Sequence, residues 1–332
     1  MGSIMSKLLD LEKEEERKKK MNIVVHMTEC RPSSTVASAR VARFISTKLG
    51  LLLVDTKQKA YELRGCNIDK LIIVNGPMAF CDFLPELSDL VRATKRNDGR
   101  VIWVQQDYTI MPPSATSKAE SPFRRVFAEL GLRPDFWTTC ENNVMRPGDR
   151  YINWNQLTYD QQPFRMMNKT SVLYYGAYRE KREESFKRFL YGLNCPITIS
   201  TTTRRMKKFQ ELGIGVSFVP TFDDVIKDAC HFDAALYIED DKSHTQFHSP
   251  ANRFYEMLSA GVPMFFDYKA VPMLEKAGII VPAKWTVEDN FDLGKKYAST
   301  DLVTMRQEQR NMWSKDYVGE LTERLKEIWN EL

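Results

Sequence analysis

Residues 175–182, YGAYREKR, have the composition of an anion-binding loop. Gly176 permits close approach of a ligand to the backbone, and the free N–H groups at the start of the following predicted helix favour negative charge. Arg179 and Arg182 can hold a diphosphate through charge-assisted hydrogen bonds. The same charges also fit the solvated first turn of an ordinary helix. The loop has no G-x-G-x-x-G motif and the chain has no G-x-x-x-x-G-K-[ST] motif, so neither a dinucleotide fingerprint nor a P-loop is supported.

A second candidate site lies in residues 253–263, RFYEMLSAGVP, which follow a predicted buried strand. We expect Ser249 and Pro250 to begin a helix here. The spacing of three residues places Arg253 and Glu256 on one face of that helix. A glutamate there can accept both hydroxyls of a ribose, and the arginine can reach a phosphate. The spacing fits a simple intrahelical ion pair equally well.

Asp107 ends another predicted strand, RVIWVQQD, and is followed by a proline-containing loop. A carboxylate at the carboxyl end of a buried strand is well placed to act as a general base. An aspartate after a strand is also common in turns and caps, so this pattern alone leaves both interpretations open.

Two further segments carry weaker signals for nucleic acid. Residues 77–81 place Met78 and Phe80 beside a Gly-Pro pair, where apolar side chains could wedge into a base stack or anchor the loop on its own domain. The basic residues Lys118, Arg124 and Arg125 could contact phosphates or form an ordinary solvated helix face.

The amino-acid composition narrows the classes of partner, cofactor and cellular compartment that fit this chain. The 332 residues carry a net charge of +4, which permits a phosphate-bearing partner without requiring one. The six cysteines include no C-x-x-C pair, and no apolar run approaches the length of a membrane span. His244 and His248 lack a third ligand at a suitable spacing, so we expect no protein-held metal site. We therefore expect a soluble protein of a reducing cytoplasm, with no membrane partner.

Short apolar runs alternate with amphipathic stretches along most of the chain, which predicts an α/β fold with parallel sheets and crossover helices. We expect a charged leader (residues 1–20), a first Rossmann-like domain (21–167) that binds the acceptor, a second that binds a nucleotide sugar (168–300), and C-terminal helices (301–332) that pack back toward the first domain. The two domains would face each other across a cleft.

The string EMLSAGVPMFF resembles a helix and strand of the nucleotide-sugar domain of GT-B glycosyltransferases. Several segments, in matching order from about residue 21 to 281, are similar to the DNA β-glucosyltransferases of T-even bacteriophages. They are MNIVVHM, RPSSTV, DKLIIVNGPMAF, the strand ending in Asp107, VLYYGAYREKREES, AALYIEDD and NRFYEML. This order is more specific than any one segment.

The resemblance implies a role for each matching residue. Asp107 would be the catalytic base, and Arg179, Arg253 and Glu256 would hold the diphosphate and the ribose. Asp240, or its neighbour Asp241, would take the role of the aspartate after the fourth strand of that domain. The loop with Pro220 and Thr221 would line the uracil, Gly176, Ala177 and Tyr178 would form the phosphate loop, and residues 77–81 would approach DNA.

Three positions depart from the family pattern. The glutamate that follows P-S-S in the family is Thr35 here, beside Ser33 and Ser34, near the acceptor and sugar. The second arginine of the phosphate loop falls on Glu183, so we assign its role to Arg182. The serine after the loop glycine is Ala177. These changes keep the donor site but leave the sugar and the modified base open.

The resemblance implies an inverting transfer of a sugar from a UDP-sugar, such as UDP-glucose or UDP-arabinose, to the hydroxymethyl group of 5-hydroxymethylcytosine or, as a second choice, 5-hydroxymethyluracil in duplex DNA. It implies base flipping, a monomer in the cytoplasm of an infected bacterium, protection of phage DNA from host nucleases, and at most a Mg²⁺ or Mn²⁺ ion that no protein site holds. Two alternatives stay open: a GT-B enzyme acting on a small molecule, lipid or glycan, and an inactive nucleic-acid-binding relative.

Overall fold

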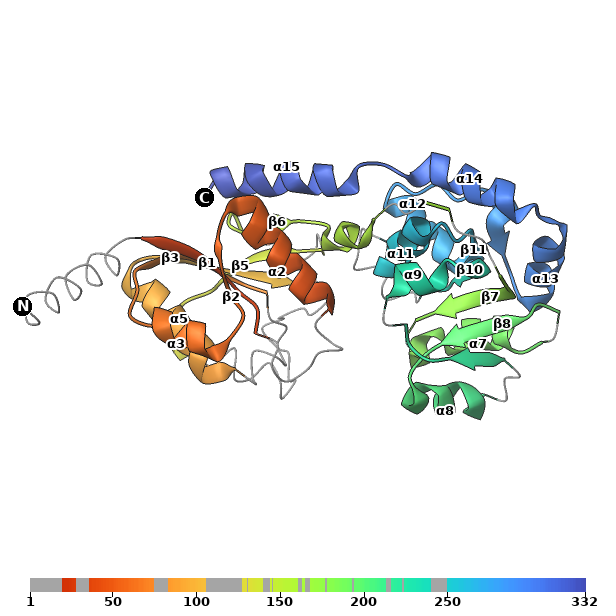
Figure 1. The fold of residues 1–332 in the computed structure, drawn as a ribbon, viewed down its shortest axis with the longest axis horizontal. Coiled ribbons are helices and arrows are strands. Elements are labelled where there is room, and N and C mark those ends of the chain that lie inside the picture. The colour runs from red at the N-terminus through yellow and green to blue at the C-terminus, as the bar shows by residue number, and fades with distance from the viewer. Residues whose placement is uncertain are drawn as a thin grey trace, which may run out of the picture. The chain divides into compact units, whose positions relative to one another are not determined.

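The computed structural model divides the chain into two compact units (Figure 1). It describes residues 20–27, 36–74, 83–105, 127–129, 131–139, 144, 146–160, 163–164, 168–176, 178–192, 194–212, 216–222, 224–239 and 250–332. The first unit is Met1–Trp154 with Leu321–Leu332, and the second is Asn155–Glu320. The sequence placed the boundary after residue 167 instead, within the segment that connects the two sheets.

The first unit contains a six-stranded sheet in the order β2-β1-β3-β4-β5-β6, in which every neighbouring pair is parallel. Its strands are β1 (Met21–Val25), β2 (Leu52–Val54), β3 (Ile68–Ile73), β4 (Arg100–Gln105), β5 (Asp135–Thr138) and β6 (Arg150–Tyr151). Its helices include α2 (Val36–Leu49), α3 (Lys57–Leu63) and α5 (Leu84–Arg96). Parallel pairing requires such crossovers between consecutive strands.

Alternating strand residues build the core of this unit. Ile23 and Val25 of β1 point toward the cluster that contains Leu87 and Leu90 of α5, and all four are fully buried. Val24 points to the opposite face and is equally buried. Burial on both faces explains why the central strands read as continuous apolar runs.

The last helix, α15 (Tyr317–Asn330), ends in the first unit. There Lys70 Nζ of β3 lies 4.6 Å from the centre of the Trp329 ring, and Arg150 of β6 forms a 2.9 Å ion pair with Glu331. Helix α14 (Leu302–Trp313) belongs to the second unit, where the Gln309 side chain exchanges two 2.8 Å hydrogen bonds with the backbone of Met264.

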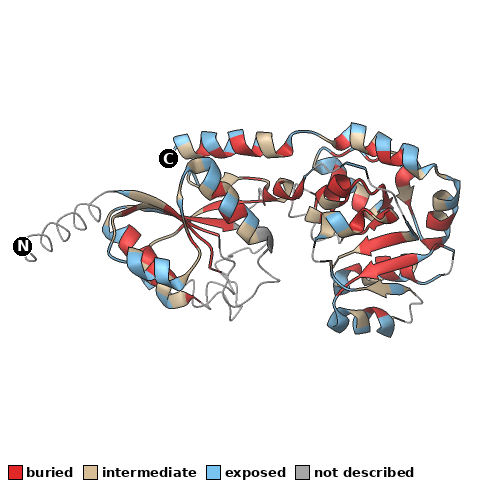
Figure 2. Cartoon of the chain, in the orientation of Figure 1, coloured by how far each residue is buried: buried red, intermediate tan, exposed pale blue. Residues whose placement is uncertain are grey.

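The second unit contains a six-stranded parallel sheet in the order β12-β11-β10-β7-β8-β9. Its strands are β7 (Lys169–Tyr175), β8 (Ile197–Ser200), β9 (Ser217–Val219), β10 (Phe232–Tyr237), β11 (Met264–Asp267) and β12 (Thr286–Val287). Its other helices include α7 (Glu183–Leu190), α8 (Thr203–Glu211), α9 (Val225–Ala229), α11 (Asn252–Ala260), α12 (Val271–Lys276) and α13 (Asn290–Ser299). Figure 2 shows that most residues of its central strands are buried.

This strand order has a topological switch point between β7 and β10. The chain moves outward from β7 through β8 to β9, then returns to the other side of β7 and continues from β10 to β12. The connections after β7 and β10 therefore leave the sheet in opposite directions, and open α/β sheets bind ligands at the carboxyl edge beside such a point. In the first unit the corresponding point lies between β1 and β3.

Helix α11 begins at Asn252 with Ala251 as its N-cap, so the expected start at Ser249 and Pro250 is wrong. The backbone there is already bound, because the Ala251 N–H donates to the Tyr237 hydroxyl at 3.1 Å and the Pro250 carbonyl accepts from Asn155 at 3.2 Å. The helix ends at Gly261, whose φ of 66° is left-handed, with the Val262 N–H donating to the Met257 carbonyl at 2.9 Å.

In the part of the chain that the structure describes, no helix is long and apolar enough to cross a membrane.

Candidate functional site

The candidate site lies at the carboxyl edge of the second sheet, at its switch point. Gly176 directly follows β7, and Glu239 lies two residues beyond the end of β10. Strands β7 and β10 are parallel neighbours, so their carboxyl ends lie together. Arg253, in the first turn of α11, is the third element of the site.

Glu239 holds two arginines, one on each carboxylate oxygen. Arg182 Nη2 donates to Oε1, and Arg253 Nη2 donates to Oε2. All three residues are buried, and the largest exposed fraction among them is the 8% of Arg253. We call this set the arginine triad. It carries two formal positive charges against one negative charge, which suits an anionic ligand.

The surroundings keep the Arg253 guanidinium charged. Burial acts to lower the pKa of Arg253, but the adjacent Glu239 carboxylate, with the Tyr174 and Tyr237 hydroxyls, raises that pKa above its ordinary value. Burial, with Glu239 next, also raises the pKa of Tyr237. The guanidinium therefore stays cationic throughout the physiological pH range.

Gly176 makes room for this arrangement. A Cβ atom at position 176 would lie 2.7 Å from Arg253 Nη1 and 3.0 Å from the Tyr174 hydroxyl. A residue without a side chain lets the loop after β7 pass this close to the guanidinium, whereas the predicted approach of a ligand to the Gly176 backbone stays a prediction.

Two polar atoms at the site are buried without a hydrogen-bond partner among the described residues: the Tyr174 hydroxyl and Arg253 Nε. Both can donate a hydrogen bond. Because a buried donor without a partner is costly, two of them beside a glycine and a surplus positive charge fit a site that an anion completes.

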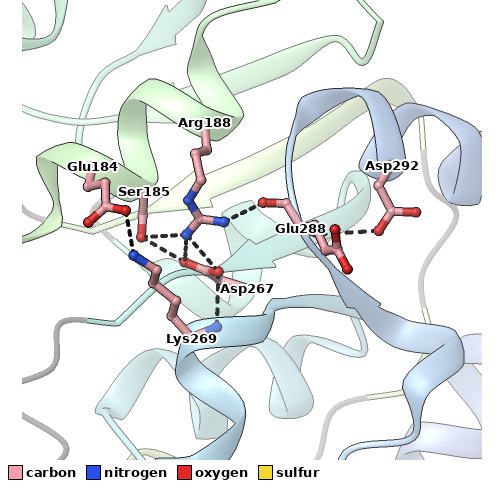
Figure 3. Close-up of polar contacts among 7 residues, drawn as sticks. All are labelled: Glu184, Ser185, Arg188, Asp267, Lys269, Glu288 and Asp292. Carbon is pink, nitrogen blue, oxygen red and sulfur yellow. Dashed lines mark hydrogen bonds and ion pairs between the residues drawn. The ribbon is translucent and has the colours of Figure 1, made fainter.

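A second cluster of polar contacts fixes helix α7, which begins directly after Arg182 (Figure 3). Asp267, fully buried at the end of β11, accepts from Ser185 at 2.7 Å and from Arg188 Nη2 at 2.9 Å on each oxygen. It also caps the following turn by accepting from the Lys269 N–H at 3.1 Å. Lys269 Nζ pairs with Glu184 at 2.6 Å.

The start of α7 is thus tied to two strands on the far side of the switch point. Arg182 binds Glu239, two residues beyond β10, and Ser185 and Arg188 bind the end of β11. A 3-10 turn (Glu180–Arg182) leads directly into the helix, and the Arg182 and Glu183 N–H groups donate to the Arg179 and Glu180 carbonyls.

The remaining predicted residues of the second unit take different positions. Arg179 is exposed, unlike Arg182, and Glu256 is half-buried. Tyr178 is half-buried and its hydroxyl donates to Glu183 at 3.2 Å; burial, with Glu183 next, raises the pKa of Tyr178. Pro220 and Thr221 are exposed after β9, and the Pro220 carbonyl accepts from the Ser200 hydroxyl at 3.1 Å.

Several predicted site residues lie outside the described residues. They are Ser33, Ser34, Thr35, Met78, Phe80, Asp107, Lys118, Arg124, Arg125, Ala177 and Asp240. In the chain, residues 28–35 follow β1, residues 75–82 follow β3, and Asp107 comes two positions after the end of β4. The roles of these residues stay predictions.

Sequence reasoning missed Glu239 and Asp267. Both carried the signal that was used for Asp107, a carboxylate at the carboxyl end of a buried strand: AALYIED for Glu239 and PMFFD for Asp267. Their partners could not be read from spacing, since Arg182 is 57 residues from Glu239 and Arg188 is 79 residues from Asp267.

Among the described residues, no group of three or more His, Cys, Asp or Glu side chains could hold a metal ion.

No protein-family model and no curated protein matches the chain. Solved structures do match over nearly its whole length. T4 phage BGT in complex with its UDP-glucose substrate is 15% identical, with a TM-score of 0.64 over 93% of this chain and 99% of that one. An α-glucosyltransferase in complex with UDP and a 13-mer DNA is 11% identical, with a TM-score of 0.60 over 93% and 99% of the two chains.

The Anabaena protein HepE in complex with UDP is 10% identical, with a TM-score of 0.56 over 94% of this chain and 100% of that one. At such identities these likenesses establish the fold. The chain has the GT-B fold, with two α/β units that each contain a six-stranded parallel sheet, and the predicted fold class is confirmed.

Proposed function

We propose that this chain transfers a sugar from a UDP-sugar to the hydroxymethyl group of 5-hydroxymethylcytosine in duplex DNA, with 5-hydroxymethyluracil as the second choice of base. The observation that carries the proposal is the buried arginine triad at the switch point of the second sheet. Its surplus positive charge, the glycine beside it and two buried donors fit a diphosphate.

The donor binds with its diphosphate at the arginine triad and its uridine toward the loop after β9. Arg253 and Arg182 supply charge-assisted hydrogen bonds to the diphosphate. Exposed Arg179 reaches the diphosphate from the solvent side. Glu256, three residues after Arg253 on the same helix, accepts the ribose hydroxyls.

Support for DNA as the acceptor comes from two sources. Segments of the first unit resemble the phage DNA β-glucosyltransferases, among them RPSSTV and DKLIIVNGPMAF. One solved structure with this fold is an α-glucosyltransferase bound to both UDP and DNA. Met78 and Phe80 would fill the gap left by a flipped nucleotide, and Lys118, Arg124 and Arg125 would bind phosphates of the duplex.

The reaction is a single displacement with inversion. The acceptor oxygen bonds to the anomeric carbon while the bond from that carbon to UDP breaks, and the electron pair leaves on the UDP phosphate. Asp107 takes the proton of the acceptor hydroxyl. The positive charges of the triad stabilise the leaving diphosphate, whose negative charge grows during the step.

Nucleoside mass spectrometry tests the proposal. The protein is incubated with a panel of UDP-sugars and with duplexes that contain 5-hydroxymethylcytosine, 5-hydroxymethyluracil or only cytosine, and the DNA is digested to nucleosides. We expect one hexose or pentose mass on the hydroxymethylated nucleoside, and none on cytosine. The Asp107→Ala variant should lose transfer by a factor of about 10² to 10⁴ and still bind UDP.

Each other outcome points elsewhere. Release of free sugar from a UDP-sugar, with no nucleoside gaining mass, would show that the donor site is active. It would point to an acceptor other than DNA, namely a small molecule, lipid or glycan. UDP binding with neither transfer nor hydrolysis would indicate an inactive relative. Parallel reactions with a chelator, Mg²⁺ or Mn²⁺ show whether a divalent ion assists the diphosphate.

A further inference from the structure

Helix α8 carries four basic residues within five positions, Arg204-Arg205-Met206-Lys207-Lys208, and all four basic side chains are exposed. Arg204, Lys207 and Lys208 lie three and four residues apart, so they share one face of the helix. Lys208 pairs with Glu211 at 3.1 Å. Within the described part of the chain, Arg204, Arg205 and Lys207 have no acidic partner. We call Arg204, Arg205, Lys207 and Lys208 the α8 basic face.

This charge pattern works against the helix itself. The first turn of α8 contains no acidic residue, and its N-cap, Thr202, makes no side-chain capping hydrogen bond. Cations in the first turn of a helix oppose its dipole, and like charges three or four residues apart repel each other. Charges that destabilise their own helix in this way are expected mainly at functional sites.

Helix α8, which carries the α8 basic face, begins at the same edge of the sheet as the arginine triad. Helix α8 begins after the carboxyl end of β8, and β8 is the parallel neighbour of β7. Phe209 of α8 is fully buried and packs edge-on against Tyr178 of the loop after β7, with ring centroids 5.3 Å apart. One packed aromatic pair therefore joins the helix to the predicted phosphate loop.

We propose that the α8 basic face binds the phosphodiester backbone of the duplex DNA acceptor; this inference rests on the proposed function. The positive charges of the α8 basic face favour a polyanionic partner. The exposed residues of α8 are Thr203, Arg204, Arg205, Lys207, Lys208, Gln210 and Glu211, with no apolar side chain among them. A helix that inserts into an anionic membrane surface needs such side chains, so DNA is the better fit.

Salt-dependent DNA binding tests the inference. The double variant Arg204→Gln/Lys207→Gln is compared with the parent and with Lys276→Gln/Lys295→Gln. The control removes the same charge from two exposed lysines of α12 and α13, which have no ion pair among the described residues. Fluorescence anisotropy gives the Kd for a hydroxymethylated duplex from about 50 to about 200 mM salt.

For the α8 variant we expect weaker binding at every salt concentration, and a log–log salt slope smaller by about 2, or about 0.9 for each lost phosphate contact. The control variant should behave like the parent, and the Kd for UDP should be the same in all three proteins. An α8 variant with the affinity and slope of the parent would overturn the inference, as would an equal loss in the control.

Two more measurements separate this inference from the proposed function. If the parent transfers sugar but the α8 variant binds DNA as the parent does, only this inference fails. If DNA binding depends on α8 and no nucleoside gains a sugar, the proposed function fails, and the α8 basic face is a DNA-binding surface without being part of a transfer reaction. Binding of anionic phosphatidylserine vesicles that depends on α8, with DNA binding unchanged in the variant, would overturn it in favour of a membrane surface.

Discussion

Glu239 shows how one residue can prepare a binding site. Removing two guanidinium groups and a carboxylate from water is costly, and pairing offsets that cost only when the geometry is good. Each oxygen of Glu239 accepts from a different arginine, so both cations are held at fixed positions before a ligand arrives. A diphosphate bound at this site would meet donors that are already oriented, which would favour tight binding.

The proposed contact between Glu256 and the ribose can be tested by replacing this one residue. Replacing it with alanine should weaken the binding of UDP by about 10- to 100-fold, because a charged hydrogen bond to a hydroxyl contributes about 1.5–3 kcal/mol. The same change should matter much less for 2′-deoxy-UDP, which lacks one of the two hydroxyls. Calorimetric titration of both ligands checks this. Equal losses for UDP and 2′-deoxy-UDP would speak against ribose recognition through the 2′-hydroxyl.

At the scale of elements, α7 owes its position to strands that are distant in the sequence. Its apolar side is legible from FKRFL, and the sequence predicted a helix over this segment. Its polar ties to Glu239 and Asp267 were not predicted, because they join residues brought together only by the return of the chain across the switch point. The start of α11 was misplaced for a related reason: its first backbone groups bind Tyr237 and Asn155.

The Arg188–Asp267 ion pair should contribute to the stability of the protein by anchoring α7. Asp267 is fully buried, so Asp267→Asn should destabilise the protein by about 3–5 kcal/mol by leaving Arg188 without its anion. A double-mutant cycle with Arg188→Gln should show a coupling of about 0.5–3 kcal/mol.

The exposed pair Lys284–Glu308, 2.6 Å apart, is the matched control for that cycle, and its coupling should stay below about 1 kcal/mol. Urea denaturation followed by circular dichroism measures both cycles. Similar couplings for the two pairs would mean that the Asp267 cluster does not anchor α7.

For the whole molecule, the sequence predicted the fold better than it predicted the site. Alternating apolar strands and amphipathic helices identify two parallel sheets, since that pattern depends on local periodicity and burial. The order of the strands, and with it the switch point, depends on long-range pairing that no local pattern encodes. Of the predicted site, the structure brings Gly176, Arg182 and Arg253 together, and the acceptor-side predictions fall outside the described residues.

The stability of the molecule should depend on pH through His26. This residue follows β1 and is 3% exposed, and burial, with the nearby Arg43 charge as a further cause, lowers the pKa of His26 in the folded state. The unfolded chain, with an ordinary pKa of about 6.5, then binds the proton more readily. The free energy of unfolding should therefore fall as pH drops below about 6.5 and level off below the folded-state pKa.

Urea denaturation at pH 7.5 and at pH 5.5 measures this dependence, with His26→Gln as the comparison. The variant should lose less stability than the parent between the two pH values. A parent and a variant with the same change would show that His26 is not the group responsible.

The central claim is that the arginine triad binds the diphosphate of a UDP-sugar, and calorimetric titration of UDP and uridine against the parent and Arg253→Gln tests it most directly. Arg253→Gln should weaken UDP binding by about 10- to 100-fold, because a charge-assisted hydrogen bond to phosphate is lost. It should leave the Kd of uridine, which has no phosphate, unchanged. An unchanged Kd for UDP, or an equal loss for uridine, would contradict the claim.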